Sequence, residues 1–272
     1  MCSTAAASVI DPASRTAIRH SSARSVGIRK FYGIDRKHSV RDGIIRFRRD
    51  AEPGMTTLQD KTMVIIGAGS GIGRRIADDA TALGARVISV GRPEVDLADE
   101  GTVHALAERV GELDYLVSLA ADHANGPVTE LDHDAVHRAF DAKVIGPILL
   151  AKHFAPRFRA GGAILLFSGV AAWRPTPGRA VMATTNAAAA ALAEALAVEL
   201  APVRVNAISP GIVDSGVWDD PGKEAFFQTV ADRNPARRVG TPADISSAAL
   251  LALTNPFLAG ATLHVDGGGR LA

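Results

Sequence analysis

A short loop rich in glycine gives this sequence its clearest chemical signal. The run Val64–Arg74 reads Val-Ile-Ile-Gly-Ala-Gly-Ser-Gly-Ile-Gly-Arg, with Gly67, Gly71 and Gly73 in a Gly-x3-Gly-x-Gly spacing. An apolar run before the loop and a helical pattern after it predict a strand, a turn and a helix N-terminus. Glycines let backbone approach a pyrophosphate closely, and the first amide groups of the helix bind the anion. The loop therefore predicts a nucleotide-binding protein.

Two pairs of titratable side chains are further candidates for chemistry. Asp122 and His123 follow a predicted strand at its carboxyl end, where ligands bind in open α/β sheets. They are candidate acids or bases, and ordinary loop residues are the alternative interpretation. His133 and His137 have the i, i+4 spacing of metal ligands, but the sequence offers no third ligand, so we expect no metal site.

The elements that must position these residues alternate between strand and helix. The predicted strands are Thr62–Ile66, Arg86–Val90, Tyr115–Leu119, Ala163–Phe167, Arg204–Ile208 and Thr262–Val265. The predicted helices are Gly71–Leu83, Gly101–Val110, Asp132–Phe158, Asn186–Leu200, Lys223–Arg233 and Pro242–Leu253. Almost nothing separates Val90 from Asp96, where a crossover helix is expected. The pattern predicts an α/β fold, a doubly wound parallel sheet (Rossmann fold) in a single domain, shortened after the second strand.

The composition excludes several classes of protein. With 47% hydrophobic residues among 272, the chain can bury a full core, and no apolar run is long enough to cross a bilayer. Its single cysteine, Cys2, excludes an internal disulfide and fits a reducing compartment, so we expect a cytoplasmic protein.

Positive charge is concentrated in the N-terminal segment. Residues 1–54 hold 11 Lys and Arg against 5 Asp and Glu, whereas residues 55–272 hold 19 against 24. We interpret residues 1–54 as a disordered extension and residues 55–272 as the folded domain. A transit peptide or a basic arm for an anionic surface is the alternative. We expect a small-molecule substrate, and neither a nucleic acid nor a membrane as partner.

The glycine spacing resembles that of the short-chain dehydrogenase/reductase family, and three later motifs extend the resemblance to nearly all of residues 60–272. Asp96-Leu97 resembles the pair that contacts adenine. Arg204–Ser215 resembles the segment whose Pro-Gly turn carries the nicotinamide carboxamide, with Ser215 where threonine is usual. Val265–Gly268 resembles the C-terminal strand and turn. The resemblance implies an NAD(P)-dependent oxidoreductase and, from the packing of the Ala-rich helix between subunits, a homodimer or homotetramer.

The resemblance also implies a set of cofactor-binding residues. They are Gly67, Gly69, Ser70, Gly71, Ile72, Gly73, Arg92, Asp96, Leu97, Ala120, Pro210, Gly211, Ile212 and Ser215. A carboxylate at the end of the second strand would bind the ribose of NAD, whereas a basic residue there accommodates the 2′-phosphate of NADP. Arg92 stands at this position with no acid immediately beside it, which favours NADP, with NAD as the alternative.

The residues that move protons in this family are replaced. The family uses a tyrosine, a lysine four residues later, a serine and an asparagine, and the aligned positions here are Met182, Asn186, Gly169 and Lys143. A methionine has no proton to donate. Neither tyrosine is a suitable substitute, because Tyr32 lies in the extension and the other, Tyr115, begins a buried strand.

Lys143 is the first candidate for a substitute proton donor. A partly desolvated lysine near a positively charged nicotinamide would have its pKa lowered towards the working pH, although a structural lysine is the alternative. Ser168, Asp122 and His123 complete the set of candidate catalytic residues.

Two hypotheses of function follow. The first is an NADP-dependent oxidoreductase that acts on a small carbonyl or alcohol with a non-standard proton donor. The alternative is a nonredox enzyme or a nucleotide-binding protein on the same fold.

Overall fold

The computed structural model describes residues 57–69, 71–216 and 221–272. The chain divides into two units, Met1–Glu52 and Pro53–Ala272, and the second is described below. The predicted extension 1–54, Tyr32 and the predicted cofactor residue Ser70 lie outside the described residues.

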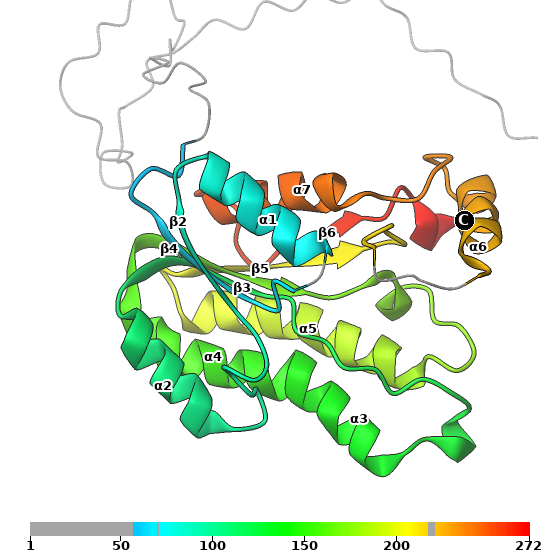
Figure 1. Cartoon of the computed structure of the whole chain (residues 1–272), viewed down its shortest axis with the longest axis horizontal. Coiled ribbons are helices and arrows are strands. Elements are labelled where there is room, and N and C mark those ends of the chain that lie inside the picture. The colour runs from blue at the N-terminus through cyan, green and yellow to red at the C-terminus, as the bar shows by residue number, and fades with distance from the viewer. Residues whose placement is uncertain (1–56, 70, 217–220) are drawn as a thin grey trace, which may run out of the picture. The chain divides into compact units, whose positions relative to one another are not determined.

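Six parallel strands form one sheet in the order β2-β1-β3-β4-β5-β6 (Figure 1). The strands are β1 (Thr62–Ile66), β2 (Arg86–Val90), β3 (Leu113–Ser118), β4 (Phe158–Phe167), β5 (Arg204–Pro210) and β6 (Thr262–Val265). The strand order reverses between β1 and β3, and in such sheets ligands bind at the carboxyl ends of the strands beside that reversal. The predicted doubly wound parallel sheet is confirmed.

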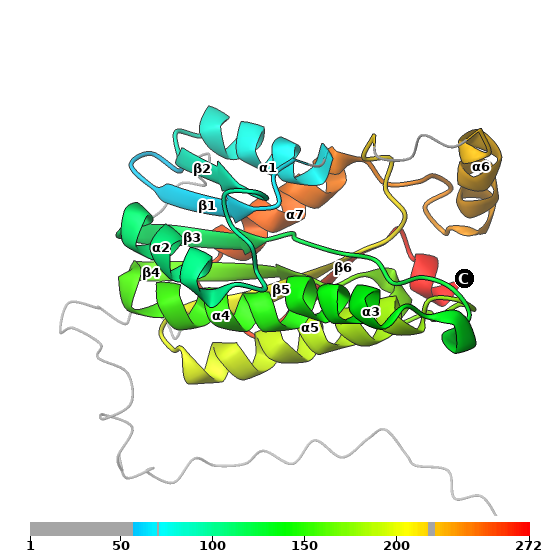
Figure 2. The ribbon, with the colours of Figure 1, turned by 60° about the horizontal axis from the view of Figure 1, so that its bottom comes forward.

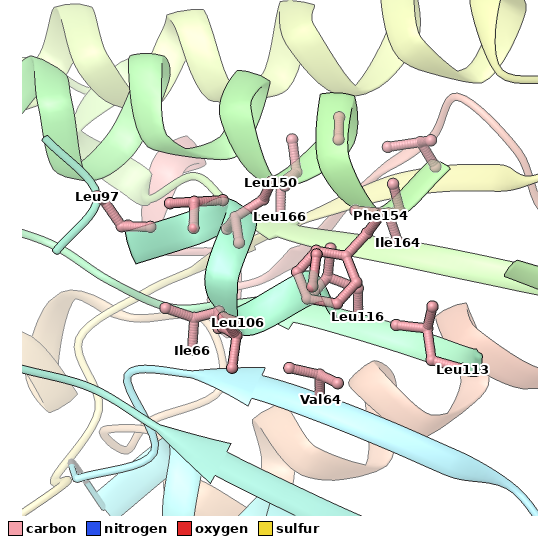
Figure 3. Close-up of a cluster of buried hydrophobic side chains, with 14 of the residues drawn as sticks. Val64, Ile66, Leu97, Leu106, Leu113, Leu116, Leu150, Phe154, Ile164 and Leu166 are labelled. Carbon is pink, nitrogen blue, oxygen red and sulfur yellow. The ribbon is translucent and has the colours of Figure 1, made fainter. Parts of the chain in front are cut away.

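Helices cover both faces of this sheet. In Figures 1 and 2, α1 (Gly71–Ala82) and α7 (Pro242–Thr254) lie on one face, and α2 (Glu100–Val110), α4 (Gly146–Phe154) and α5 (Ala180–Glu199) lie on the other. The remaining helices are α3 (His133–Phe140) and α6 (Lys223–Arg233). Because side chains alternate along a strand, β1 sends Val64 into one buried apolar cluster and Met63 into the other. Figure 3 shows the first cluster, in which Phe154 of α4 packs over the sheet.

The predicted shortening after the second strand is confirmed. Residues 91–99, which connect β2 to α2, form neither helix nor strand, and within the described residues β2 forms one edge of the sheet. Val95 and Leu97 in this connection are buried in the apolar cluster beneath α2. The short connection is therefore anchored to the core by its own side chains.

The helical span predicted over Asp132–Phe158 is present from His133 to Arg157, but its helix type changes along the segment. The segment contains α3, a π-helix over Asp141–Ile145, α4, and a 3₁₀ turn, and β4 begins at Phe158. Pro147 stands in the first turn of α4 and has no backbone N–H to continue the preceding α-helical ladder, which accounts for the change in helix type. The π-helix places Lys143 within this irregular turn.

The helix predicted over Asn186–Leu200 begins earlier, at Ala180. Among the described helices, only α5 is long and apolar enough to cross a membrane, which corrects the expectation that no apolar run in the sequence is. Its buried residues include Val181, Asn186, Ala189 and Leu196, and the helix packs against β4 and β5. The apolar face of α5 is thus part of the protein core.

Candidate active site

The loop between β1 and α1 requires its glycines. Gly67 has a φ of +90°, and a Cβ there would lie 3.0 Å from the backbone nitrogen of Ala120. A Cβ at Gly73 would lie 2.8 Å from the carbonyl oxygen of Gly67. The first turn of α1 contains no acidic residue, so no carboxylate opposes an anion at its N-terminus. These features fit the binding of a dinucleotide phosphate.

The segment after β5 lies against the same loop. A Cβ at Gly71 would stand only 2.0 Å from the carbonyl oxygen of Ser215, and one at Gly211 would stand 2.7 Å from the Cα of Asp266. Glycine is therefore needed at both positions for close backbone contact. The structure thus brings two predicted cofactor segments together although they are far apart in the sequence.

A cavity of about 540 Å³ opens at the carboxyl ends of β1, β2 and β3. This volume lies within the range of small-molecule sites. The predicted cofactor residues that line the cavity are Gly67, Arg92, Asp96, Leu97, Ala120 and Ser215. Gly69, Gly71, Ile72, Gly73, Pro210, Gly211 and Ile212 are outside its lining. The cavity matches the part of the predicted site that would hold the adenosine end of a dinucleotide.

Arg92 projects from the end of β2 with a side chain that is 68% exposed. Its Nη2 lies 3.5 Å from Oδ2 of Asp122, which follows β3. The sequence places no acid immediately beside Arg92, but the fold does. Only β1 separates the ends of β2 and β3, so Asp122 comes close to Arg92. The charge offered to a 2′-phosphate is therefore partly offset by Asp122.

Lys143 is partly buried and makes three hydrogen bonds to oxygen atoms. Its Nζ donates to the carbonyl oxygens of Phe167 and Ser168, each at 3.1 Å, and to Oδ1 of Asn186. Burial lowers the pKa of Lys143 to about 8, because desolvation disfavours the charged form. An ammonium whose pKa lies near neutrality can donate a proton and recover it from water.

Asn186 connects the positions that the sequence analysis aligned with the family's proton relay. Its side chain is buried in α5, with Oδ1 accepting from Lys143. A Cβ at Gly169 would lie 2.7 Å from Nδ2 of Asn186, so the asparagine amide fills the space of a side chain at Gly169. Three of the four positions aligned with that relay therefore form one contact set, in which Lys143 supplies a positive charge.

Sequence reasoning did not find this role for Asn186. A buried asparagine in an Ala-rich helix was the available signal, since a buried amide needs polar partners. Its partner is 43 positions away, and spacing along the chain does not show that contact.

The other catalytic candidates lie in different surroundings. The hydroxyl of Ser168 is buried and donates to the carbonyl oxygen of Asn186 at 2.8 Å, so its proton is already engaged in a hydrogen bond. Asp122 and His123 line the cavity beside Arg92, and the backbone N–H of His123 donates to Oδ1 of Asp122 at 2.9 Å. Tyr115 is buried, and desolvation raises its pKa. The structure brings together Lys143 and Ser168, whereas Asp122 and His123 belong with Arg92.

The histidines of α3 contact one another and a neighbouring acid. The Nε2 atoms of His133 and His137 lie 3.1 Å apart, and Nδ1 of His133 lies 3.0 Å from Oδ1 of Asp134. Within the part of the chain that the structure describes, no group of three or more His, Cys, Asp or Glu side chains could hold a metal ion.

Two family profiles match this sequence. One, described as enoyl-(acyl carrier protein) reductase, matches residues 93–269. The other, described as the NAD binding domain of D-isomer specific 2-hydroxyacid dehydrogenase, matches residues 28–126 and so includes the glycine loop.

Individual proteins match over the same region. L-xylulose reductase from Bos taurus is 32% identical over 240 residues, which cover 78% of this chain and 97% of the relative. The short-chain dehydrogenase/reductase ucsE from Acremonium sp is 29% identical over 256 residues, covering 79% of this chain and 97% of that protein. The crystal structure of a small-chain dehydrogenase in complex with NADPH superimposes with a TM-score of 0.74 at 34% identity, covering 78% of this chain and 99% of the other.

The glycine loop, the reversal of strand order and these matches lead to one conclusion: the chain belongs to the short-chain dehydrogenase/reductase family, whose members similar to it are nicotinamide-dependent oxidoreductases.

Proposed function

We propose that this chain is an NADP-dependent oxidoreductase of a small ketone or aldehyde, and of the matching alcohol, with Lys143 as proton donor. Arg92 at the end of β2 supports NADP, and a related structure is described as a complex with NADPH. L-xylulose reductase of Homo sapiens, 30% identical, and D-erythrulose reductase of Gallus gallus, 28% identical, are named for ketose substrates. These names support a small polar carbonyl compound as the substrate class.

The position of the Lys143 ammonium carries the proposal. Its contacts are Asn186, where the family has its lysine, and the carbonyls just before Gly169, where the family has its serine. The charge that accompanies proton transfer in the family is thus supplied here from the π-helix. Met182 offers no proton at the tyrosine position, whereas Lys143 is a titratable group that contacts Asn186 at the aligned lysine position.

The residues of this chain divide the work in reduction. The glycine loop and the N-terminus of α1 would hold the pyrophosphate, and Arg92 would contact the ribose phosphate. A bound nicotinamide would supply the hydride. Lys143 would release one of its carbonyl hydrogen bonds, donate a proton to the substrate carbonyl oxygen, and recover a proton from water. In oxidation, the free amine of Lys143 would accept the alcohol proton.

One observation favours the second candidate, a nonredox enzyme or a nucleotide-binding protein. The three hydrogen bonds of Lys143 use all three donors of an ammonium. If those bonds persist when a ligand is bound, Lys143 is a structural residue and the cavity binds a nucleotide without turnover.

The test combines cofactor titration with turnover. The full chain is titrated with NADPH and NADH, and oxidation of the cofactor is then followed with a panel of small ketoses, ketones and aldehydes. We expect binding and turnover in the parent, and loss of at least about a hundredfold in kcat in Lys143→Ala with little change in cofactor Kd. Lys152→Ala, an exposed lysine of α4, is the matched control.

Each other outcome identifies a different error. Binding without turnover favours the second candidate. Unchanged turnover in Lys143→Ala excludes this residue as the donor, and absence of binding for both dinucleotides contradicts the nucleotide site itself.

A further inference from the structure

The cavity contains a positively charged and a negatively charged side chain in contact, at the position expected to face the ribose 2′ group that distinguishes NADP from NAD. Arg92 comes from the end of β2 and Asp122 from the loop after β3, and both line the cavity with Gly67 of the phosphate loop. A basic residue at this position suits a 2′-phosphate, whereas a carboxylate suits a ribose 2′-hydroxyl. The cavity therefore contains the chemical group for each choice.

The two side chains differ in freedom. Asp122 is 29% exposed, and its Oδ1 accepts from the backbone N–H of His123 at 2.9 Å, so the carboxylate is fixed to its own loop. The Arg92 side chain is 68% exposed, and its contact with Asp122 is 3.5 Å long. Arg92 can therefore move towards a ligand, while Asp122 stays in place.

The remaining charges of the cavity do not cancel Asp122. Asp96 uses Oδ1 to accept from the backbone N–H of Ala98 at 3.0 Å, and Asp141 adds a further carboxylate to the lining. Arg138 supplies the other positive charge, 3.9 Å from Asp132. A 2′-phosphate would thus meet Arg92 only in competition with a fixed carboxylate.

We propose that Asp122 is a specificity-determining residue of the cofactor site, which weakens NADPH binding by holding Arg92 and repelling the 2′-phosphate, and leaves NADH as a usable ligand. The proposal rests on the proposed binding of a nicotinamide dinucleotide. It gives Asp122 a role in cofactor selection in place of the acid–base role predicted from the sequence.

The test is a comparison of Kd values for NADPH and NADH in the full chain, measured by the fluorescence of the bound cofactor. In Asp122→Asn the carboxylate becomes a neutral amide of the same shape. We expect NADPH to bind about three- to tenfold more tightly than in the parent, with little change or a small loss for NADH. The gain should shrink as salt is raised, because screening weakens the removed repulsion.

Glu94→Gln is the matched control. This substitution changes the net charge by the same amount, and Glu94 lies close to Arg92 in the sequence. Glu94 does not line the cavity, and its ion-pair partner is Arg109 at 2.6 Å. We expect this variant to bind both cofactors as the parent does. Thermal unfolding of both variants shows whether either has lost its fold, and Asp122→Ser replaces Asp122→Asn if that variant has.

The results separate this inference from the proposed function. Equal effects of Asp122→Asn and Glu94→Gln, or equal changes for NADPH and NADH, would overturn the role of Asp122 while leaving dinucleotide binding intact. A parent chain that binds neither dinucleotide would overturn both proposals.

Discussion

At the scale of single residues, the site depends on how a partly buried ammonium is accommodated. Lys143 has no carboxylate among its hydrogen-bond partners, which are two backbone carbonyls and the amide of Asn186. Dipoles stabilise the charge less than a full negative charge would, so desolvation dominates and the pKa falls to about 8. The absence of a formal counter-charge from these contacts keeps Lys143 acidic enough for proton donation.

The pH dependence of turnover follows from this pKa. Reduction needs the protonated amine, so kcat should be level below pH 8 and fall about tenfold per pH unit above it. Asn186→Asp places a carboxylate against Nζ, which favours the charged form and should move this fall upward by about one to two pH units. The measurement is the pH profile of kcat for reduction in both proteins. A fall that stays at the same pH would show that another group is titrating.

The contact between Lys143 and Asn186 also predicts a coupling in stability. Lys143→Asn removes the donor of three buried acceptors and should lower the free energy of unfolding by about 1–3 kcal/mol. Asn186→Lys brings two ammonium groups together and should also destabilise. The double exchange restores one lysine and one asparagine. We therefore expect its loss of stability to be at least about 1 kcal/mol smaller than the sum of the losses of the two single variants.

Urea unfolding of the parent, the two single variants and the double variant measures this coupling. The control cycle combines Asn186→Lys with Lys152→Asn, because Lys152 is exposed on α4 and pairs with Glu100. Additive losses in both cycles would mean that the Lys143–Asn186 contact contributes no specific stability.

At the scale of elements, the phosphate loop depends on glycines for two different reasons. Gly71 touches the backbone of another segment, since a Cβ would lie 2.0 Å from the carbonyl oxygen of Ser215. Among the described residues, none beyond its chain neighbours has a heavy atom within 4 Å of a Cβ added at Gly69. Replacing each of these glycines by alanine therefore distinguishes two roles: close packing between segments at Gly71, and open space for a ligand at Gly69.

Gly71→Ala should push the segment after β5 away from the loop. Because overpacking a close contact is destabilising, we expect a loss of about 2 kcal/mol or more in the free energy of unfolding, and weaker NADPH binding. Gly69→Ala should leave stability within about 0.5 kcal/mol of the parent, while still affecting cofactor affinity. Urea unfolding and NADPH titration of both variants check this difference. Equal stability of the two variants would contradict the contact with Ser215.

The elements also show how far the sequence alone leads. The bounds predicted for β1, β2 and β6 match the structure, because short β-branched runs there end at glycine or turn residues. The sequence predicted the helical span over Asp132–Phe158 but not the π-helix within it. Where the sequence failed, the cause was a contact or a local helix type that periodicity does not report, as with Asp122 beside Arg92 and Asn186 beside Lys143.

At the scale of the whole molecule, the proposed oligomer would need apolar surface outside the core. Ile148 of α4 and Val198 of α5, two helices that cover the same face of the sheet, are 45% and 82% exposed. Replacing an exposed apolar side chain by a charge weakens an interface while costing an isolated surface little. We expect Ile148→Lys to lower the molar mass measured by light scattering from that of a dimer or tetramer, whereas Leu251→Lys on α7 is a comparison at another exposed apolar position. A monomeric parent would contradict the oligomer.

The boundary between the two parts of the chain gives the last prediction. Within the described residues, the three buried apolar clusters draw their side chains from positions 58–265, and the residues that line the cavity lie within the same stretch. A fragment of residues 55–272 should therefore fold cooperatively and bind NADPH with a Kd within about twofold of the full chain at physiological salt. At low salt the full chain should bind faster, because residues 1–54 add 11 Lys and Arg against 5 Asp and Glu to a domain with an excess of acid. Stopped-flow binding of NADPH to both proteins at two salt concentrations measures these effects. A fragment that folds but loses NADPH affinity at physiological salt would place part of the cofactor site in residues 1–54 and would move the domain boundary toward the N-terminus.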